Sequence, residues 1–438
     1  MLLRFGIENM YSFRDYQEIS LVAPKSSQRE EIRGLLPTNG AIKDPVLPIL
    51  ATYGANASGK SNLLVTLVHF LKAISDSHST PGMPDITHSP FLLDDTSSRA
   101  PSRMDCDVII DGCRHHYGFR LDSQRILEEW LYAFSSNNRR RVLFHRSLQE
   151  SDPYYFGTHL KGNLQGIKSQ TRPDSLFLST AGINNHATLN SVWNYFRSQF
   201  MRNINIDHRS TLSNDIIKLE TSALLRNFVI ALLREADTGI SDIAFKKLPD
   251  ELNNAITIEL ENSGLTIENK KIIYEILPKQ QIDFIHQTNS GAYNLPYGLE
   301  SRGTQTILSI AIQLHTVLER GSVMIVDELE ASLHPYVAAR LIELFQNPET
   351  NPHRAQLLFT THHPHLMNSL APAQIVICEK NRQGATEIYP LTALQPRKGE
   401  NLANGYLKGR YGGIPYMGSI FNHLPREEKQ VAPEEVAR

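Results

Sequence analysis

The sequence predicts an α/β fold that combines a mixed sheet, an N-terminal antiparallel sheet and an inserted compact helical lobe. A buried strand, a glycine-rich loop and an amphipathic helix follow one another between residues 46 and 71. Strand-like segments crowd residues 104–146, and helices alternate with strands after residue 304. Since 438 residues exceed the roughly 250–300 at which one core stops growing, we expect two lobes.

The N-terminal part of the chain predicts antiparallel strands. Residues Leu2–Ile7 and Tyr16–Val22 alternate between apolar and polar side chains, with a polar turn between them. We therefore assign residues 1–146 to the first half of the main domain. Four further strands are expected at Asp105–Ile110, His115–Leu121, Leu127–Phe134 and Arg141–Arg146.

The middle of the chain predicts a mainly helical lobe, which we place at residues 147–250. Residues 147–172 are polar and read as a loop, whereas residues 174–235 read as largely helical. The segment Leu189–Phe200 has an aromatic stripe, which we interpret as core packing and not as a cofactor site. No sustained heptad repeat is present, so no long coiled coil is expected.

Residues 251–425 predict the second half of the main domain, and residues 426–438 a flexible tail. Three strands come first and an alternation of helices and strands follows. The strands are expected at Ala255–Leu260, Lys271–Leu277, Gln281–Gln287, Val323–Val326, Gln356–Thr361 and Gln374–Glu379, and the helices at Thr304–Arg320 and Pro335–Asn347.

Composition excludes several classes of protein. The chain is 41% hydrophobic and carries a net charge of −2, so no global charge draws it to nucleic acid or anionic lipid. Cys106, Cys113 and Cys378 form no CxxC pair, which supports neither a disulfide framework nor a Cys-based zinc site. No apolar run approaches the roughly 20 residues that span a bilayer, and the N-terminus lacks a signal peptide's apolar region. We expect a cytoplasmic protein without a membrane partner.

The most informative segment is Gly54–Ser61, which matches the phosphate-binding pattern G-x-x-x-x-G-K-[ST]. A strand, a glycine turn and a helix start direct backbone N–H groups toward one anion, at the positive end of the helix dipole. Lys60 is expected to reach the β- and γ-phosphates, and the Ser61 hydroxyl to ligate Mg²⁺. The expected nucleotide contacts in this segment are Gly54, Asn56, Gly59, Lys60, Ser61 and Asn62.

Two carboxylates follow the apolar strand Val323–Val326 and complete the predicted site. Asp327 is expected in the Mg²⁺ shell, and Glu328 is placed to polarise the attacking water as general base. The alternative for this pair is a solvated acidic turn. His362, at the end of the next apolar strand, either contacts a γ-phosphate or is an ordinary strand-end histidine.

Two further segments leave alternatives open. Ser301 and Gly303 open a helix, so they either cap that helix or bind a γ-phosphate. The histidines around His362 could instead suggest a metal site. No carboxylate or cysteine lies at ligand spacing beside them, which disfavours metal; the four are His353, His362, His363 and His365.

The order of these motifs resembles that of ABC-type ATPases: phosphate loop, signature (Ser301–Thr304), acidic strand, D-loop (Ser332–Pro335) and switch histidine. Within that class the chain is similar to the chromosome-maintenance and recombination-repair branch, and in particular to ATPase subunits of abortive-infection (phage-resistance) systems. The resemblance covers nearly the whole chain. The signature departs from Leu-Ser-Gly-Gly-Gln, and no Q-loop glutamine is placed.

The resemblance implies an ATPase that uses ATP and Mg²⁺ and forms a head-to-tail homodimer or a higher homo-oligomer. Ser301 and Gly303 of one chain would cap the γ-phosphate held by Lys60 of the other, Glu328 would act in hydrolysis and His362 would sense its outcome. The implied role is an antiviral defence subunit that senses a trigger and controls a separate, co-encoded effector nuclease or toxin.

The alternative is a stand-alone DNA-repair or recombination ATPase that binds nucleic acid directly. Its candidate phosphate contacts are Arg139–Arg141, Arg397, Lys398, Lys408 and Arg410, each of which also fits a solvated charged turn. An ATPase fused to a nuclease is disfavoured, because no aspartate follows Asp327 to form a metal-binding pair.

Overall fold

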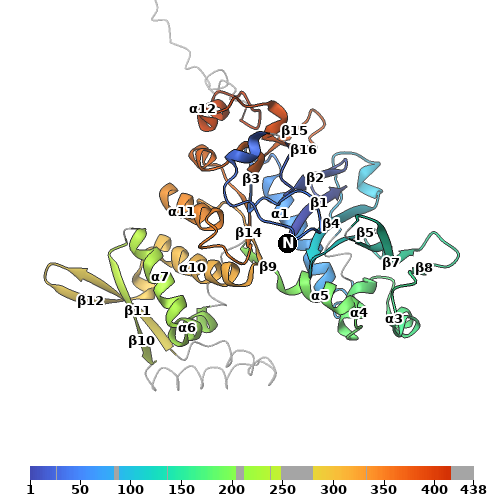
Figure 1. Cartoon of the computed structure of the whole chain (residues 1–438), viewed down its shortest axis with the longest axis horizontal. Helices are drawn as coiled ribbons and strands as arrows, with labels where there is room; N and C mark the ends of the chain where they lie inside the picture. Colours follow the sequence, from blue (N-terminus) through green and yellow to red (C-terminus); the bar gives the residue numbers. More distant parts are fainter. Residues whose placement is uncertain are drawn as a thin grey trace, which may run out of the picture.

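The computed structural model describes residues 1–25, 27–82, 88–135, 137–203, 212–236, 238–247, 280–331 and 333–415. Within these residues the chain forms three sheets, of seven, six and three strands. In Figure 1 the seven-stranded sheet lies on the right, the six-stranded sheet in the middle and the three-stranded sheet at the far left. The predicted mixed α/β architecture is confirmed, and no long coiled coil occurs in the described ranges.

The seven-stranded sheet is antiparallel throughout, with the order β2-β1-β4-β5-β6-β7-β8. All six strands predicted for the N-terminal part are present in it, and only β8 was not expected. The strands are β1 (Leu2–Glu8), β2 (Gln17–Ser20), β4 (Ser102–Ile110), β5 (Cys113–Leu121), β6 (Ile126–Phe134), β7 (Arg140–Ser147) and β8 (Tyr154–Phe156).

The six-stranded sheet has the order β16-β15-β3-β14-β13-β9, in which only β16 runs antiparallel to its neighbour. Every residue of β3, β13 and β14 is buried, as continuous apolar strands covered on both faces should be. Because these three are parallel, their carboxyl ends meet at one edge. The strands are β3 (Ile49–Tyr53), β9 (Phe200–Asn203), β13 (Val323–Val326), β14 (Gln356–Thr360), β15 (Ile375–Lys380) and β16 (Thr386–Pro390).

The three-stranded sheet is an antiparallel meander of β10 (Ile240–Lys247), β11 (Gln280–Thr288) and β12 (Gly291–Pro296). The predicted strand at Gln281–Gln287 is therefore confirmed as β11. The strands predicted at 255–260 and 271–277, and the tail at 426–438, lie outside the described residues.

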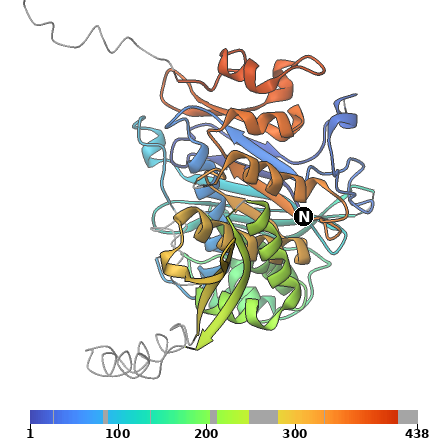
Figure 2. The same cartoon turned by 90° about the vertical axis from the view of Figure 1, so that its left-hand side faces the viewer.

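Helices divide between two hydrophobic cores. One core joins α1, α4 and α5 to the seven-stranded sheet, and the other joins α7, α10 and α11 to the six- and three-stranded sheets. Figure 2 looks onto the side that carries the three-stranded sheet, with the red C-terminal helix at the top. The helices are α1 (Lys60–Asp76), α3 (Leu164–Gln170), α4 (Phe177–Ile183), α5 (Leu189–Ser198), α6 (Leu212–Thr221), α7 (Ala223–Glu235), α10 (Arg302–Arg320), α11 (Pro335–Gln346) and α12 (Leu402–Leu407), with 3₁₀ turns at Ser27–Glu31, Ser97–Arg99, Tyr297–Leu299, Pro364–Ser369, Pro372–Gln374 and Leu391–Leu394.

The aromatic stripe on α5 packs in the core, as predicted. Trp193 and Phe196 are buried, and the Phe196 ring meets Phe70 of α1 edge-on at 5.8 Å. Phe70 in turn stacks on Phe119 of β5 at 5.4 Å and meets Phe5 of β1 at 5.6 Å. Helix α1 therefore lies directly against the inner face of the seven-stranded sheet.

The local predictions between residues 147 and 250 are partly wrong. The segment predicted as a loop at 147–172 contains β8 and α3. Among the described residues of 174–235 the chain is largely helical, as predicted, with α4, α5, α6 and α7, but it also contains β9. Strand β9 is only four residues long and forms by parallel pairing with β13, so periodicity along the sequence carries little sign of it. The helical lobe also includes β10. Helices α4 and α5 pack on α1, whereas α7 packs on α10. The domain boundaries at residues 146 and 250 stay a prediction.

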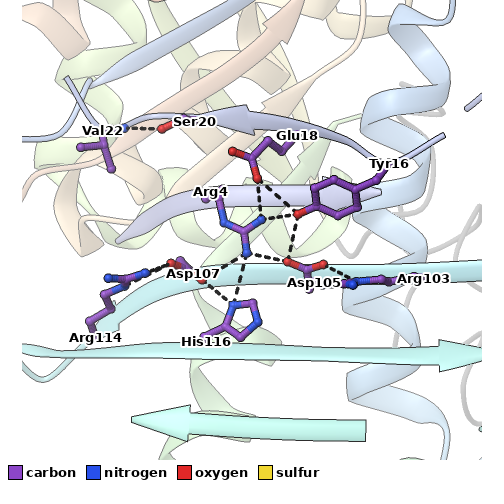
Figure 3. Close-up of polar contacts among 10 residues, drawn as sticks. All are labelled: Arg4, Tyr16, Glu18, Ser20, Val22, Arg103, Asp105, Asp107, Arg114 and His116. Atoms are coloured by element: carbon purple, nitrogen blue, oxygen red, sulfur yellow. Dashed lines mark hydrogen bonds and ion pairs between the residues drawn. The ribbon is translucent and has the colours of Figure 1, made fainter. Parts of the chain in front are cut away.

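The outer face of the seven-stranded sheet carries a network of charged side chains (Figure 3). Asp105 and Asp107 of β4 are buried carboxylates, and Arg4 of β1 reaches both, at 2.5 and 3.4 Å. Asp107 also accepts hydrogen bonds from Arg114, and its Oδ1 lies 2.6 Å from His116 Nδ1. Burial alone would raise the pKa of Asp107, but these partners outweigh it and lower the pKa to about 2.

Asp107→Asn is expected to lower the free energy of unfolding by about 2 kcal/mol at pH 5. The pKa of Asp107 falls from 3.8 to about 2 on folding, so its stabilisation is complete above about pH 4 and is lost toward pH 2. Urea unfolding should therefore show the difference shrinking to about half at pH 3. Asp111→Asn, in the exposed β4–β5 turn, is the control. An equal loss at both pH values would contradict the prediction.

Candidate functional site

The glycine-rich loop joins the buried strand β3 to helix α1 and requires glycine at both glycine positions of the phosphate-binding pattern. Gly59 has φ 110°, and a Cβ there would lie 2.2 Å from Thr386 Oγ1. A Cβ on Gly54 would lie 2.3 Å from the Cys378 carbonyl oxygen. The loop therefore fits closely against β15 and β16, and any side chain at these positions would displace it.

The start of α1 is open to an anion. Gly59 is its N-cap and offers no side chain to the first N–H groups, and no acidic residue lies in the first turn. The Lys60 ammonium folds back over the loop, with Nζ donating to Gly54 O at 2.9 Å and to Ala55 O at 2.8 Å. Burial lowers the pKa of Lys60, and nearby acidic groups only partly offset this.

Strand β13 delivers Asp327 to the same place. Ser61 Oγ donates to Asp327 Oδ1 at 3.1 Å, and Thr360 Oγ1, at the end of β14, donates to the same oxygen. Thr360 also accepts from the Glu328 N–H at 2.8 Å, and Glu328 takes the left-handed conformation with φ 52°. One buried hydroxyl thus sets the positions of both predicted carboxylates.

His362 and Glu328 lie side by side at the mouth of this site. His362 Nε2 is 3.8 Å from Glu328 Oε1, and the two side chains are 38% and 53% exposed, so solvent reaches both. The His362 N–H donates to Glu330 Oε1 at 2.5 Å. The second oxygen of Glu330 is buried and has no hydrogen-bond partner among the described residues.

Thr360 and Glu330 are the two site residues that the sequence analysis missed. Thr360 is predicted only as part of an apolar strand, yet it is the last residue of that strand, at the edge where Asp327 also emerges. Glu330 stands two residues after Glu328, and a third acid in so short a segment was the available signal. Only the pairing of β13 with β14 shows what these side chains touch.

The other two predicted nucleotide contacts, Asn56 and Asn62, differ in their surroundings. Asn56 is exposed at the tip of the loop. Asn62 donates from Nδ2 to Ser12 Oγ at 2.9 Å, and Ser12 in turn accepts from Thr386 Oγ1 at 2.8 Å. Thr386 lies within hydrogen-bond reach of the Ser58 carbonyl as well, at 2.8 Å. The amide of Asn62 is therefore engaged in bracing the loop.

Ser301 and Gly303 lie at the start of α10, beside the three-stranded sheet (Figure 1). Ser301 Oγ accepts from the Thr304 N–H at 3.1 Å, which is an ordinary N-cap. Glu300, just before it, is held by His286 of β11. In the part of the chain that the structure describes, no hydrogen bond joins Ser301 to Lys60 or Ser61.

The donors at this site fit Mg²⁺ held together with phosphate oxygens. Ser61 and Asp327 offer two hard oxygen ligands within 3.1 Å of each other. Magnesium in such sites takes one or two protein oxygens and completes its shell with phosphate and water. Among the described residues, no group of three or more His, Cys, Asp or Glu side chains could hold a metal by itself. The histidines near His362 therefore form no such group.

Two general expectations can be compared with the structure. Cys106, Cys113 and Cys378 are free thiols. Among the helices that the structure describes, none is both long enough and apolar enough to cross a bilayer.

Structural comparison finds similarity to head domains of SMC proteins. An SMC head bound to the C-terminal winged-helix domain of ScpA is 12% identical (TM-score 0.48; 89% of this chain, 97% of that one). The SMC head domain from Thermotoga maritima is 11% identical (TM-score 0.39; 89% and 98%). An SMC head with an extended coiled coil, bound to a ScpA domain derived from Pyrococcus furiosus, is 11% identical (TM-score 0.42; 90% and 97%). No curated protein matches the sequence.

The sequence also matches a family model over residues 49–368, which is well over half of the chain. The family is described as "AAA domain, putative AbiEii toxin, Type IV TA system". The matched range begins with β3 and ends after His362, so it includes Lys60, Ser61, Asp327, Glu328, Thr360 and His362. The resemblance that the motif order carried is therefore confirmed, and the chain belongs to this family of AAA-type ATPase domains.

Proposed function

We propose that the chain is an ATP-hydrolysing subunit of an antiviral, abortive-infection type defence system, in which ATP joins two copies head to tail. The observation that carries the ATPase part is the convergence of Lys60, Ser61, Asp327 and Glu328 at one sheet edge. The family description, which names an AbiEii toxin and a toxin–antitoxin system, supports the defence role.

Each residue has a role that its surroundings favour. Lys60 and the free N–H groups of α1 would bind the phosphates, and Ser61 and Asp327 would hold Mg²⁺, which neutralises phosphate charge when bound. Glu328, exposed and beside His362, would accept a proton from the attacking water. Glu330 would hold His362 in place through the backbone N–H.

The dimer part of the proposal comes from what one chain lacks. Ser301 and Gly303 lie at a helix start where, among the described residues, the side-chain cap is Ser301 itself. Leu299, next to them, is 71% exposed, and Tyr336 at the start of α11 is 79% exposed. The proposed dimer would cover both side chains. A second copy would supply its phosphate loop to this face, and the closed dimer would act on a separate nuclease or toxin.

Ser301→Arg is expected to abolish ATP-dependent dimers while a single chain still binds ATP. The arginine would fill the space that a partner's γ-phosphate requires. Dimerisation is measured by light scattering with and without ATP and Mg²⁺, and binding by calorimetry. Ser301→Ala removes the same helix cap, at a cost of about 1 kcal/mol, without adding bulk.

Ser290→Arg, in the exposed β11–β12 turn, is the matched control for the added charge and size. It should dimerise as the wild type does. Unchanged ATP-dependent association of Ser301→Arg would refute the head-to-tail dimer and leave the ATP site itself untouched.

A further inference from the structure

The outer face of the seven-stranded sheet contains a groove of about 670 Å³ beside the network of Figure 3. Its walls come from the β1–β2 hairpin, the loop at residues 40–44, strands β4 and β5, and the tip of the β6–β7 hairpin. None of its lining residues belongs to the phosphate site. The groove is therefore a second feature that the proposed ATPase does not explain.

The acidic groups of the groove are already neutralised within the chain. Asp107 is buried and shared among Arg4, Arg114 and His116. Asp44, in the loop at 40–44, is paired with Arg29 at 2.6 Å. The groove consequently presents little free negative charge to a ligand.

Of the basic residues that line the groove, Arg4 and Arg114 are paired with Asp107, whereas Lys43 faces solvent. Lys43 is exposed on one wall, and Arg139, Arg140 and Arg141 are exposed at the β6–β7 hairpin beside the lining residues Asn137 and Asn138. Arg114 Nη1 approaches Asn138 Oδ1 at 3.4 Å, which ties the hairpin tip to the network. Exposed cations with amide donors between them suit a ligand that carries several negative charges along its length.

A row of stacked planar groups continues from the groove across the sheet. The Arg140 guanidinium lies 5.0 Å from the centre of the Tyr132 ring, and His116 stacks on Tyr132 at 5.8 Å. Register explains the row, since Tyr132 of β6 pairs with His116 of β5, which pairs with Asp107 of β4. Tyr132 and His116 are partly exposed, so another flat ring can stack against their edges or faces.

Trp130 extends the same row toward β2. The Arg103 guanidinium lies 5.2 Å from both the Trp130 and the Tyr16 ring centres. The Trp130 ring lies across Gly118, and a Cβ on Gly118 would lie 2.4 Å from that ring. Tyr16, at the end of the row, is 37% exposed. The planar groups are therefore held in place before any ligand arrives.

We propose that this groove and the adjoining row bind a single-stranded nucleic acid. The exposed cations would contact its phosphates, and the partly exposed rings and guanidinium groups would stack with its bases. A duplex hides its base faces and offers phosphates alone. An acidic protein segment offers carboxylates without flat rings. A single strand is the ligand that uses both the charged and the planar groups.

The test uses the full chain without ATP, so its outcome does not depend on the ATPase. A fluorescently labelled single-stranded oligonucleotide is titrated at several salt concentrations and followed by anisotropy. The double variant Lys43→Glu with Arg140→Glu changes only exposed side chains and is expected to bind at least about tenfold more weakly. Loss of two phosphate contacts should also reduce the slope of log K against log salt by about 1.4.

Two controls make the result specific. Lys161→Glu with Arg382→Glu makes the same charge change at exposed positions elsewhere and should bind like the wild type. An abasic strand of the same length keeps the phosphates and removes the bases, so it should bind at least about tenfold more weakly. Wild-type affinity in the Lys43/Arg140 variant, or an equal loss in the control variant, would overturn the proposed site. Equal affinity for the abasic strand, a duplex or polyglutamate would overturn the choice of a single strand.

Discussion

Lys60→Ala should weaken ATP binding by about a hundredfold, close to loss of binding in most assays. The ammonium is the one cation directed into the loop among the described residues, and it already sits 2.8–2.9 Å from the loop carbonyls of Gly54 and Ala55. A hydrogen bond between charged groups is worth up to about 3 kcal/mol, which corresponds to about a hundredfold in affinity. Calorimetry with MgATP, and the rise in melting temperature that ATP produces, both measure it.

The matched control for Lys60→Ala is Lys72→Ala, which makes the same change three turns further along α1. It should bind ATP as the wild type does. If Lys60→Ala retained wild-type affinity while remaining folded, the loop at 54–61 would not be the phosphate site. The dimer and the carboxylate roles would then lose their basis as well.

Glu328→Gln is expected to retain ATP, to slow turnover by about 10²–10⁴ and to accumulate ATP-bound dimers. The amide keeps the size of the side chain and cannot accept the proton of the attacking water. The side chain is 53% exposed, and the backbone N–H that meets Thr360 is unchanged, so folding should not suffer. Phosphate release measures turnover, and light scattering in ATP measures the dimer.

Glu349→Gln, at an exposed position beyond α11, is the control and should hydrolyse ATP normally. Near-normal hydrolysis by Glu328→Gln would remove this residue from the role of general base. Glu330 would then be the next carboxylate to test, because one of its oxygens is buried without a partner in the described chain.

The sequence predicted the central elements because their signals are local. Strand β3, the glycine loop and α1 follow directly from an apolar run, two glycines and helical spacing. Strands β13 and β14 were predicted for the same reason, since continuous apolar runs fully buried in a parallel sheet are visible in one dimension. The antiparallel strands β4–β7 showed the alternation that a half-buried sheet requires.

Several of the elements that were missed are short strands whose conformation is decided by pairing and packing. Strand β9 exists because Phe200 pairs with Val323, more than a hundred residues away. Strand β16 pairs back onto β15 and brings Thr386 against the glycine loop. Short strands of this kind have weak intrinsic preferences, and packing decides their conformation.

The same distinction separates what was known of the candidate site from what was not. The phosphate loop and the acidic pair were visible as residue types at fixed spacing. Thr360 was not, because its importance comes from contacting both Asp327 and Glu328 across two neighbouring strands. The signature also divides in this way, since its motif is local, whereas the contacts of the helix start that carries it are a property of the fold.

By itself, the sequence determined that this chain has an α/β fold, with a glycine loop at 54–61 that matches the phosphate-binding pattern and carboxylates at 327 and 328. Short-range periodicity and fixed motif spacing are sufficient for that. Only the tertiary structure decided that Thr360 and Glu330 complete the site, and that Asp107 is neutralised beneath a basic groove on a second sheet. Those arrangements arise from strand pairing and burial between residues far apart in the chain, and no local pattern encodes them.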